Sequence, residues 1–443
     1  MMRRLFQGLL TIGLVFIAGC QGLPLPGHTA APTFTPFIPT LPATAISSQS
    51  ILTPTPGKST PGGPVTLRLW LPPQFDPASG KPDGDLLQKR LVEFITGHPD
   101  VKLDVRIKAV DGSGGILDAL SAASAAAPLD LPDLVALPRP ILEAAALKGL
   151  LHPFDGISIP LEDPEWYDYA RQLSLVQKST FGLPFAGDAL LMIYRPSLVN
   201  TPPHDLTEVL TMENVLAFPA ADPQALFTLT LYQAAGGPIQ DDQGRPTLDA
   251  VILTEVLTGF QTAELKGVFP DWLTQLETDD QAWAAFQDQR TDLVITWATH
   301  YLSNSRQLLT DSATDYAAAP LPTLGGTPYT LATGWVWALA SIQPEKQSLA
   351  TELAIFLTEP NFLAEWSAAA GYLPTNTRVL TAWTNAPLQA LASQIALSAH
   401  LYPSTDLLSS LAHPLRQATL QILSRQGDPN TLAQTAVERL LNP

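Results

Sequence analysis

Several aromatic and acidic residues of this chain stand at the ends of short apolar runs. Trp70 ends the run VTLRLW, Trp297 ends LVITW, and Trp335 opens WVWAL. Asp188 lies directly before the apolar run 189–194, next to a glycine that lets a ligand or another backbone come close. Aromatic rings stack on apolar C–H faces and carboxylates accept hydrogen bonds, so these residue types suit non-covalent binding of a polar solute.

Residues for catalysis or metal binding are not grouped in a pattern with a known mechanism. The sequence contains no G-x-S-x-G, Ser-x-x-Lys or P-loop motif. Its seven histidines include no His-x₃-His or HExxH spacing, and its single cysteine excludes an intrachain disulfide and a cysteine-based metal site. We therefore expect no catalytic residue, no metal and no cofactor. A surface glycosidase that uses paired carboxylates stays open as an alternative.

Length and charge limit the classes of protein that the chain can belong to. At 443 residues, with 46% hydrophobic residues, two lobes or domains are expected. The formal net charge of −17 argues against nucleic acid as a partner, because few cations are present to neutralise phosphates. The same charge argues against a binding surface for anionic lipids.

The first 20 residues have the pattern of a secretory signal. Arg3 and Arg4 precede an apolar stretch, residues 5–17, that is too short for an ordinary membrane-spanning helix. The sequence IAGC at 17–20 resembles the lipobox of bacterial lipoproteins, in which the cysteine is acylated and becomes the first residue of the mature protein. This resemblance implies an extracytoplasmic protein that is held at the cell membrane by lipid on Cys20.

Residues 21–64 have the composition of a tether. They hold ten prolines and eight threonines, and Lys58 is their only charged residue. A segment with so few apolar side chains cannot bury enough surface to fold, so we expect an extended, polyproline-like chain. The folded part should then begin near Val65.

The part after the tether begins with alternating strand and helix patterns. These patterns predict strands at 65–70, 101–105 and 134–137 and helices at 85–97, 114–127 and 140–148. A helix between two strands is a crossover, so the three strands should be parallel. The run LVAL at 134–137 is continuously apolar, as expected for a buried parallel strand.

Several motifs occur in the order found in the substrate-binding proteins of bacterial ABC importers, the family that includes maltose-binding protein. They are a first strand that ends in Trp70, a helix that ends near HPD, and then LPDLVAL, LKGLLHPFD, GLPFAGDALLMIYR and, after two helices, GYLP. The resemblance covers nearly all of 65–443. It implies an α/β, two-lobed fold in which each lobe is a mainly parallel sheet flanked by helices and the ligand cleft lies between the lobes.

The same resemblance implies domain limits and a function. Lobe 1 is expected at 65–187 plus about 316–375, and lobe 2 at 188–315 plus about 376–443. The chain should be a monomer that captures a small solute, preferably a sugar or oligosaccharide, and delivers it to an ABC permease. A lipoprotein of the same fold that acts as a sensor is the other alternative.

Ligands of open α/β sheets bind beyond the carboxyl ends of the strands, which selects Trp70, Asp188, Trp297 and Trp335 as ligand-binding candidates. Such aromatic rings and acceptors suit the C–H face and the hydroxyls of a pyranose. Trp335 and Trp337 are expected on opposite faces of a strand at 335–339, so at most one of them should face the cleft. We expect this to be Trp335, next to Gly334.

The comparison with maltose-binding protein strengthens some of these candidates. Asp188 matches a sugar-binding acid there, and Trp297 matches a stacking tryptophan. Asp222 begins a stretch that matches a sugar-contacting segment, although Gln224 replaces an aromatic residue. Tyr301 is a further ligand candidate. Less favoured candidates are Phe75 and Tyr372, and also Arg139, which is expected at the surface.

Overall fold

The computed structural model describes residues 64–155, 161, 163–304 and 315–441. The predicted signal sequence, Cys20 and the tether up to residue 63 lie outside the described residues. Residues 61–443 group into one compact unit. None of the helices in the described ranges is long and apolar enough to cross a membrane.

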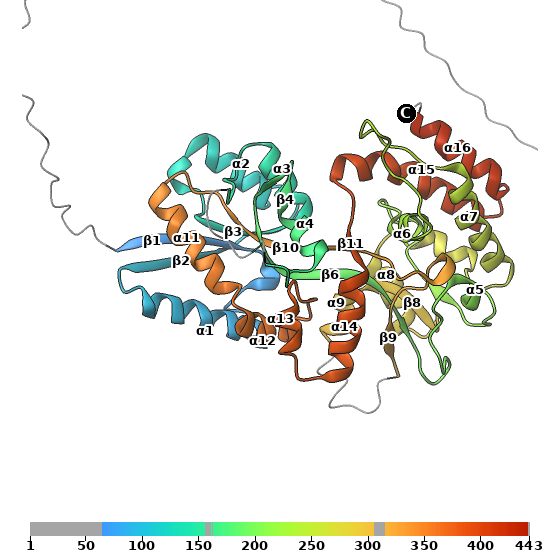
Figure 1. Ribbon diagram of the computed structural model, residues 1–443, viewed down its shortest axis with the longest axis horizontal. Coiled ribbons are helices and arrows are strands. Elements are labelled where there is room, and N and C mark those ends of the chain that lie inside the picture. Colours follow the sequence, from blue (N-terminus) through green and yellow to red (C-terminus); the bar gives the residue numbers. More distant parts are fainter. Residues whose placement is uncertain (1–63, 156–160, 162, 305–314, 442–443) are drawn as a thin grey trace, which may run out of the picture. The chain divides into compact units, whose positions relative to one another are not determined.

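One sheet runs through this unit in the order β2-β1-β3-β10-β6-β8-β7, with β11 beside β10 and β9 beside β6 (Figure 1). Its strands are β1 (Val65–Leu71), β2 (Val101–Ile107), β3 (Leu134–Pro138), β6 (Leu183–Tyr194), β7 (Leu216–Ala217), β8 (Leu293–Trp297), β9 (Ala317–Ala319), β10 (Thr330–Leu339) and β11 (Ala399–Leu401). The short strands β4 (Leu175–Val176) and β5 (Ser179–Thr180) form a separate antiparallel pair.

Helices surround both ends of the sheet. They are α1 (Pro82–Gly97), α2 (Ile116–Ala126), α3 (Arg139–Leu147), α4 (Asp168–Ser174), α5 (Leu206–Val209), α6 (Leu226–Ala234), α7 (Ala250–Leu265), α8 (Asp279–Gln287), α9 (Ala298–Leu302), α11 (Pro344–Leu357), α12 (Pro360–Ala370), α13 (Thr377–Thr381), α14 (Ala386–Ser398), α15 (Thr405–Leu423) and α16 (Pro429–Leu441). Helices α1, α3, α11, α12 and α14 carry a proline in their first two positions. Proline suits this place because a backbone N–H there has no partner within the helix.

Lobe 1 has helices on both faces of its strands. Strands β2, β1 and β3 are parallel, as the crossover pattern predicts. Helices α2, α3 and α4 bury Ile116, Leu142 and Leu173 against one face, and α1 buries Leu91 and Phe94 in the cluster on the other face. Figure 1 shows α1 and α2 on opposite sides of β1 and β2. The helices therefore bury apolar side chains on both faces of the same strands.

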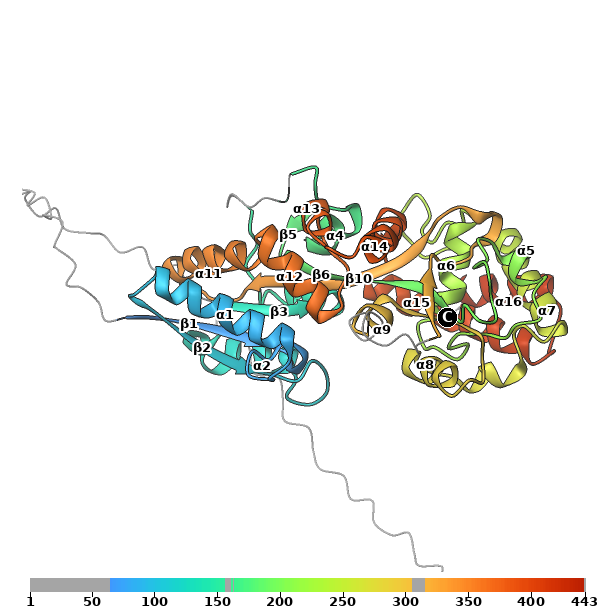
Figure 2. The same ribbon diagram turned by 90° about the horizontal axis from the view of Figure 1, so that it is seen from below.

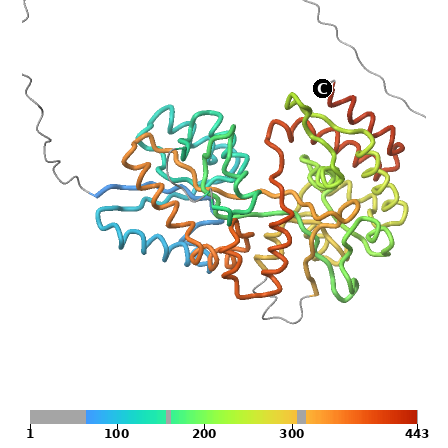
Figure 3. Tube along the Cα trace, viewed as in Figure 1, coloured from blue at the N-terminus to red at the C-terminus, as the bar shows by residue number. Residues whose placement is uncertain are grey.

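Strand β6 belongs to both lobes. Its residues 183–189 pair antiparallel with β10, and residues 190–194 pair antiparallel with β8. Strand β10 pairs with β3 through 335–339 and with β11 through 330–332. Figures 2 and 3 show β6 in green and β10 in orange running from one group of helices to the other. The two-lobed α/β prediction is confirmed, and the antiparallel pairings of the sheet all involve these two strands.

Strand β6 is longer than the sequence pattern predicts. Residues 182–184, Gly-Leu-Pro, are typical of a turn before the apolar run 189–194, yet the strand already begins at Leu183 and has 12 residues. Pro184 pairs with Val336 at the point where the register of β10 shifts by a bulge. A bulge tolerates proline, which cannot donate to the sheet. Gly187 lies opposite Gly334 in the same pairing, so two residues without side chains meet there.

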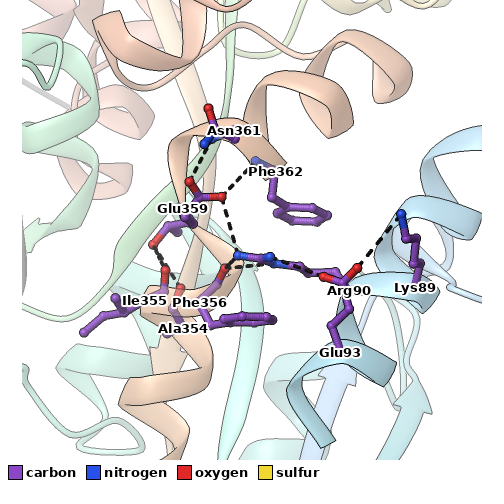
Figure 4. A network of polar contacts seen from close by, with 10 residues as sticks. Lys89, Arg90, Glu93, Ala354, Ile355, Phe356, Glu359, Asn361 and Phe362 are labelled. Atoms are coloured by element: carbon purple, nitrogen blue, oxygen red, sulfur yellow. Dashed lines mark hydrogen bonds and ion pairs between the residues drawn. The ribbon is translucent and has the colours of Figure 1, made fainter. Parts of the chain in front are cut away.

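Arg90 of α1 fastens the corner between α11 and α12 (Figure 4). Its Nε and Nη2 donate to Phe356 O at 3.2 and 2.8 Å, and the guanidinium carbon lies 3.5 Å from the centroid of the Phe356 ring. Its Nη2 also lies 3.6 Å from Glu359 Oε2. Glu359 accepts from the backbone N–H of Asn361 and Phe362 and so caps α12. This network holds three helices of lobe 1 together.

Candidate ligand-binding site

Two distant sequence motifs meet at the middle of β6. The N–H of Gly187 donates to Leu373 O at 2.9 Å, and the N–H of Leu373 donates back to Gly187 O at 2.8 Å, which sets GYLP beside GLPFAGD. A side chain at Gly187 would collide with Tyr169 Oη. Tyr169 in turn donates to Pro374 O at 2.8 Å. The glycine is therefore needed for close packing, and Asp188 follows it at the junction of the lobes.

The Asp188 carboxylate holds the start of α9. Its Oδ1 accepts from the N–H of Ala189 at 2.9 Å and from the N–H of Thr299 at 3.2 Å. Its Oδ2 accepts from the Thr299 hydroxyl at 2.8 Å. The side chain is only 9% exposed. Both oxygens are thus used within the protein, and they join the crossing strand to the helix that follows Trp297.

The surroundings of Asp188 favour its neutral form. Burial raises the pKa of Asp188 to about 7, although the hydroxyl and N–H of Thr299 lower it in part. The nearby charge of Asp279 raises this pKa further. The pKa of Tyr372 is also raised above its ordinary value, by burial first and then by the charge of Asp188. Asp188, Asp279 and Tyr372 are therefore electrostatic neighbours.

His300 of α9 joins two acids of α8. Its Nδ1 lies 2.9 Å from Asp279 Oδ2 and 2.6 Å from Thr296 Oγ1, and its Nε2 lies 3.3 Å from Asp280 Oδ1. Burial lowers the pKa of His300, but the hydrogen bond and charge of Asp279 outweigh it and leave this pKa above its usual value. Each of these three side chains has one nitrogen or oxygen atom that could ligate a metal ion, and the three atoms lie within 4.8 Å of one another. Close contacts between the histidine, whose pKa is raised, and two carboxylates account for this geometry.

A cavity of about 420 Å³ opens beside this network at the carboxyl end of β8. Trp297 and Phe227 contribute aromatic rings to its lining, and Asp222, Glu277 and Asp279 contribute carboxylates. None of the described residues that line it is basic. Burial raises the pKa of Asp222, while the backbone N–H groups of two following residues lower it. The structure therefore brings together Asp222 and Trp297 from the sequence candidates.

Lobe 1 contributes a group of aromatic rings near Asp188. The ring of Phe75 lies 5.0 Å from that of Trp335 and 5.6 Å from that of Tyr372, in edge-to-face contacts. Trp335 is half-buried, whereas Trp337 is 2% exposed and stacks on Phe185. Residues two apart in a strand share a face, so depth and not side separates the two tryptophans. The prediction that they point to opposite faces is therefore wrong. Trp335 is the more accessible of the two, and its contact with a ligand stays a prediction.

Two sequence candidates lie in other surroundings. Trp70 is 3% exposed and belongs to the core formed with α2 and α3, so the prediction that it faces a ligand does not fit its burial. Arg139 was expected at the surface but is buried, and its Nη1 donates to Gln172 O and Leu173 O at 3.2 and 3.1 Å. The last carbonyl groups of a helix lack hydrogen-bond donors within the helix. The guanidinium of Arg139 provides such a donor at the end of α4.

The remaining candidate, Tyr301, is half-buried on α9. Its ring lies 6.2 Å from that of Tyr316, and burial raises its pKa. It is not among the described residues that line the cavity. Sequence reasoning missed Thr299, His300, Glu277 and Asp279, because the strands and helices that carry them meet only in the folded chain. The capping box of Thr278 and Gln281 was the available signal, since it places acids in the first turn of α8.

A sequence model described as "bacterial extracellular solute-binding protein" matches residues 92–391. The chain belongs to this family. A comparison with curated protein sequences found no match. The family places this solute-binding protein outside the cytoplasm.

Solved structures share the fold of this solute-binding protein. The sugar-binding protein MalE from Xanthomonas citri has a TM-score of 0.69 and 17% identity, over 85% of this chain and 96% of its own. The cyclic α-maltosyl-1,6-maltose-binding protein from Arthrobacter globiformis has a TM-score of 0.68 and 17% identity, over 86% and 99%. A cyclo/maltodextrin-binding protein in complex with maltotetraose has a TM-score of 0.67 and 21% identity, over 87% and 98%. At these identities the likeness concerns the fold.

Proposed function

We propose that this solute-binding protein captures a sugar or oligosaccharide outside the cell and delivers it to an ABC permease without chemical turnover. The observation that carries the proposal is the cavity at the end of β8, where Trp297 stands beside the carboxylates of Asp222 and Asp279. An indole ring stacks on the C–H face of a pyranose, and carboxylates accept from its hydroxyls. The structural neighbours described as sugar-binding, maltose-binding and maltodextrin-binding proteins support the same ligand class.

The side chains would act in two ways. Trp297, Asp222 and Asp279 would contact the solute from lobe 2, and Trp335 and Tyr372 would approach it from lobe 1. Asp188 would act by position, because its oxygens hold Thr299 and thereby the end of β8 that presents Trp297.

Lobe closure would couple binding to delivery. A solute that touches both lobes binds the closed form better than the open form and shifts the population toward it. We place the lobe limits near the crossing strands, with lobe 1 at 65–187 plus about 316–375 as a first division. Strand β9 pairs with the second half of β6 and therefore belongs with lobe 2. We thus favour a boundary at which the chain returns to lobe 1 within β10 rather than at residue 316.

We further propose that lipid on Cys20 anchors the protein and that residues 21–64 act as a tether. Acyl chains contribute about 0.8 kcal/mol per buried CH₂ group, so several chains hold a protein firmly at a membrane. In a bacterial host, Cys20→Ser should move the protein from the membrane fraction to the soluble extracytoplasmic fraction. An unchanged distribution would exclude this anchor while leaving the binding function untouched.

Calorimetry with a panel of neutral oligosaccharides tests the binding function. We expect at least one ligand to bind at micromolar concentration, and Trp297→Ala to weaken it at least about tenfold because the stacking surface is lost. Trp272→Ala is the matched control, since Trp272 is also half-buried but lies under Arg290, outside the cavity. Equal weakening by both variants would contradict the role of Trp297. Turnover of an oligosaccharide by the purified chain would instead favour the glycosidase alternative.

A further inference from the structure

Carboxylates outnumber cations around the cavity. Asp222, Glu277 and Asp279 line it, and Asp279 is electrostatically coupled to the buried Asp188. Two cationic groups lie close by. His300 is engaged by Asp279 and Asp280, and Arg416 donates its Nε to Ala221 O at 2.8 Å.

Asp222 and Glu277 have no ion pair among the described residues. The oxygens of Asp222 accept only backbone N–H groups, from Gln224 and Leu226, both at 2.9 Å. The charge of Arg416 reaches Asp222 and lowers its pKa, but burial and Asp279 act in the opposite direction and the pKa stays raised. The lining therefore contains negative charge that the protein itself does not fully compensate.

Lobe 1 adds an acid and aromatic faces close to the same junction. Asp83, in the first turn of α1, is 9% exposed, and its carboxylate has no hydrogen bond or ion pair within the described part of the chain. Tyr372 lies within electrostatic reach of both Asp83 and Asp188. Its neighbours Phe75 and Trp335 present further aromatic edges and faces. Both lobes thus combine unpaired acids with aromatic rings.

We infer that the solute bound at this site carries a protonated amine, and, on the basis of the proposed function, that the site selects amine-bearing sugars over neutral ones. A protonated amine offers N–H donors only, which match carboxylate acceptors in charge-assisted hydrogen bonds. The faces of tryptophan and tyrosine attract the same cation. The hydroxyls of a neutral sugar can also donate to these carboxylates, but they bring no countercharge, so a neutral sugar should bind less tightly than its amine-bearing counterpart. An anionic solute would be repelled by the same carboxylates.

Calorimetry on the purified chain at pH 7 tests this inference with matched probes. The probes are a glucosamine trisaccharide, its fully N-acetylated counterpart, maltotriose, and spermidine as an amine without a sugar. We expect the glucosamine trisaccharide to bind at least tenfold more tightly than its acetylated counterpart. This ratio should fall as NaCl is raised from about 0.05 to 0.5 M, because salt screens charge attraction.

Variants of two acids separate charge from shape. Asp222→Asn and Glu277→Gln should each reduce the preference for the free amine severalfold. Asp242→Asn, at an exposed turn outside the cavity, removes the same charge from the protein and should leave the preference unchanged. A preference that falls equally in all three variants would show an effect of net charge alone and would overturn the assignment to this site.

The outcomes also separate this inference from the proposed function. Equal or tighter binding of the acetylated trisaccharide or of maltotriose would overturn the inference and leave sugar binding intact. Binding of spermidine without any sugar would support the amine and refute the sugar. If none of the four probes binds, both the proposed function and the inference fall.

Discussion

The buried carboxylate of Asp188 should make the protein less stable as the pH rises from about 4 to about 7. Burial raises its pKa from 3.8 to about 7 in the folded state. Between these two values the folded chain therefore binds more protons than the unfolded chain. Stability rises with pH only where the unfolded state binds more protons, so here it must fall with rising pH.

The size of this effect follows from the shift. A rise from 3.8 to about 7 is about three pKa units, and each unit corresponds to about 1.36 kcal/mol, which gives roughly 4 kcal/mol. The variant Asp188→Asn mimics the protonated acid. Its Oδ1 can still accept from the N–H groups of Ala189 and Thr299, and its Nδ2 can donate to the Thr299 hydroxyl.

Urea unfolding of both proteins from pH 4 to pH 8 measures the prediction. The two stabilities should be close at pH 4, and the Asn variant should become more stable by up to about 4 kcal/mol at pH 8. Asp279, His300 and Tyr372 lie near Asp188 and are present in both proteins, so the difference reports the carboxylate together with its charge coupling to these groups. A difference that does not change with pH, or that grows toward acid, would refute the reasoning.

Two further predictions concern contacts between helices, both measured by urea unfolding. Arg90→Ala should lower the free energy of unfolding by about 1–3 kcal/mol, and Arg90→Lys should recover little, since an ammonium cannot reproduce the two bonds to Phe356 O. Full recovery by lysine would contradict the role of the planar guanidinium. Glu143 accepts from the N–H and hydroxyl of Thr405 at the start of α15, so Glu143→Ala should cost about 1–2 kcal/mol and Glu143→Gln less. Equal losses would exclude a capping role.

The elements of lobe 1 could be predicted because each has a local signal. The strands β1, β2 and β3 and the helices between them lie within a few residues of the predicted ranges. The two crossing strands were harder, because glycine and proline usually mark turns. In β6 these residues serve tertiary needs instead, since Gly187 makes room for Tyr169 and Pro184 meets a bulge in β10. Such needs are visible only when the partner strand is known.

The site could be predicted in part. Trp297, at the end of β8, and Asp222, before α6, share a cavity, and their contact with a ligand stays a prediction. Trp70 also ends a strand, yet helices α2 and α3 cover it, so the position at a strand end alone does not decide exposure. Glu277 and Asp279 escaped notice because the capping box beside them marks only a helix start and does not show that these acids line a cavity.

The role of Asp188 changes most when sequence and geometry are combined. Its motif marks the crossing between lobes, and a carboxylate there reads as an anchor for ligand hydroxyls. Its three hydrogen bonds instead go to Ala189 and Thr299, so the acid braces α9 and the end of β8. A brace whose charge is disfavoured by burial and by Asp279 would be relieved by a cation bound beside Asp279. The raised pKa of Asp188 and the uncompensated charge of the cavity therefore favour the same kind of ligand.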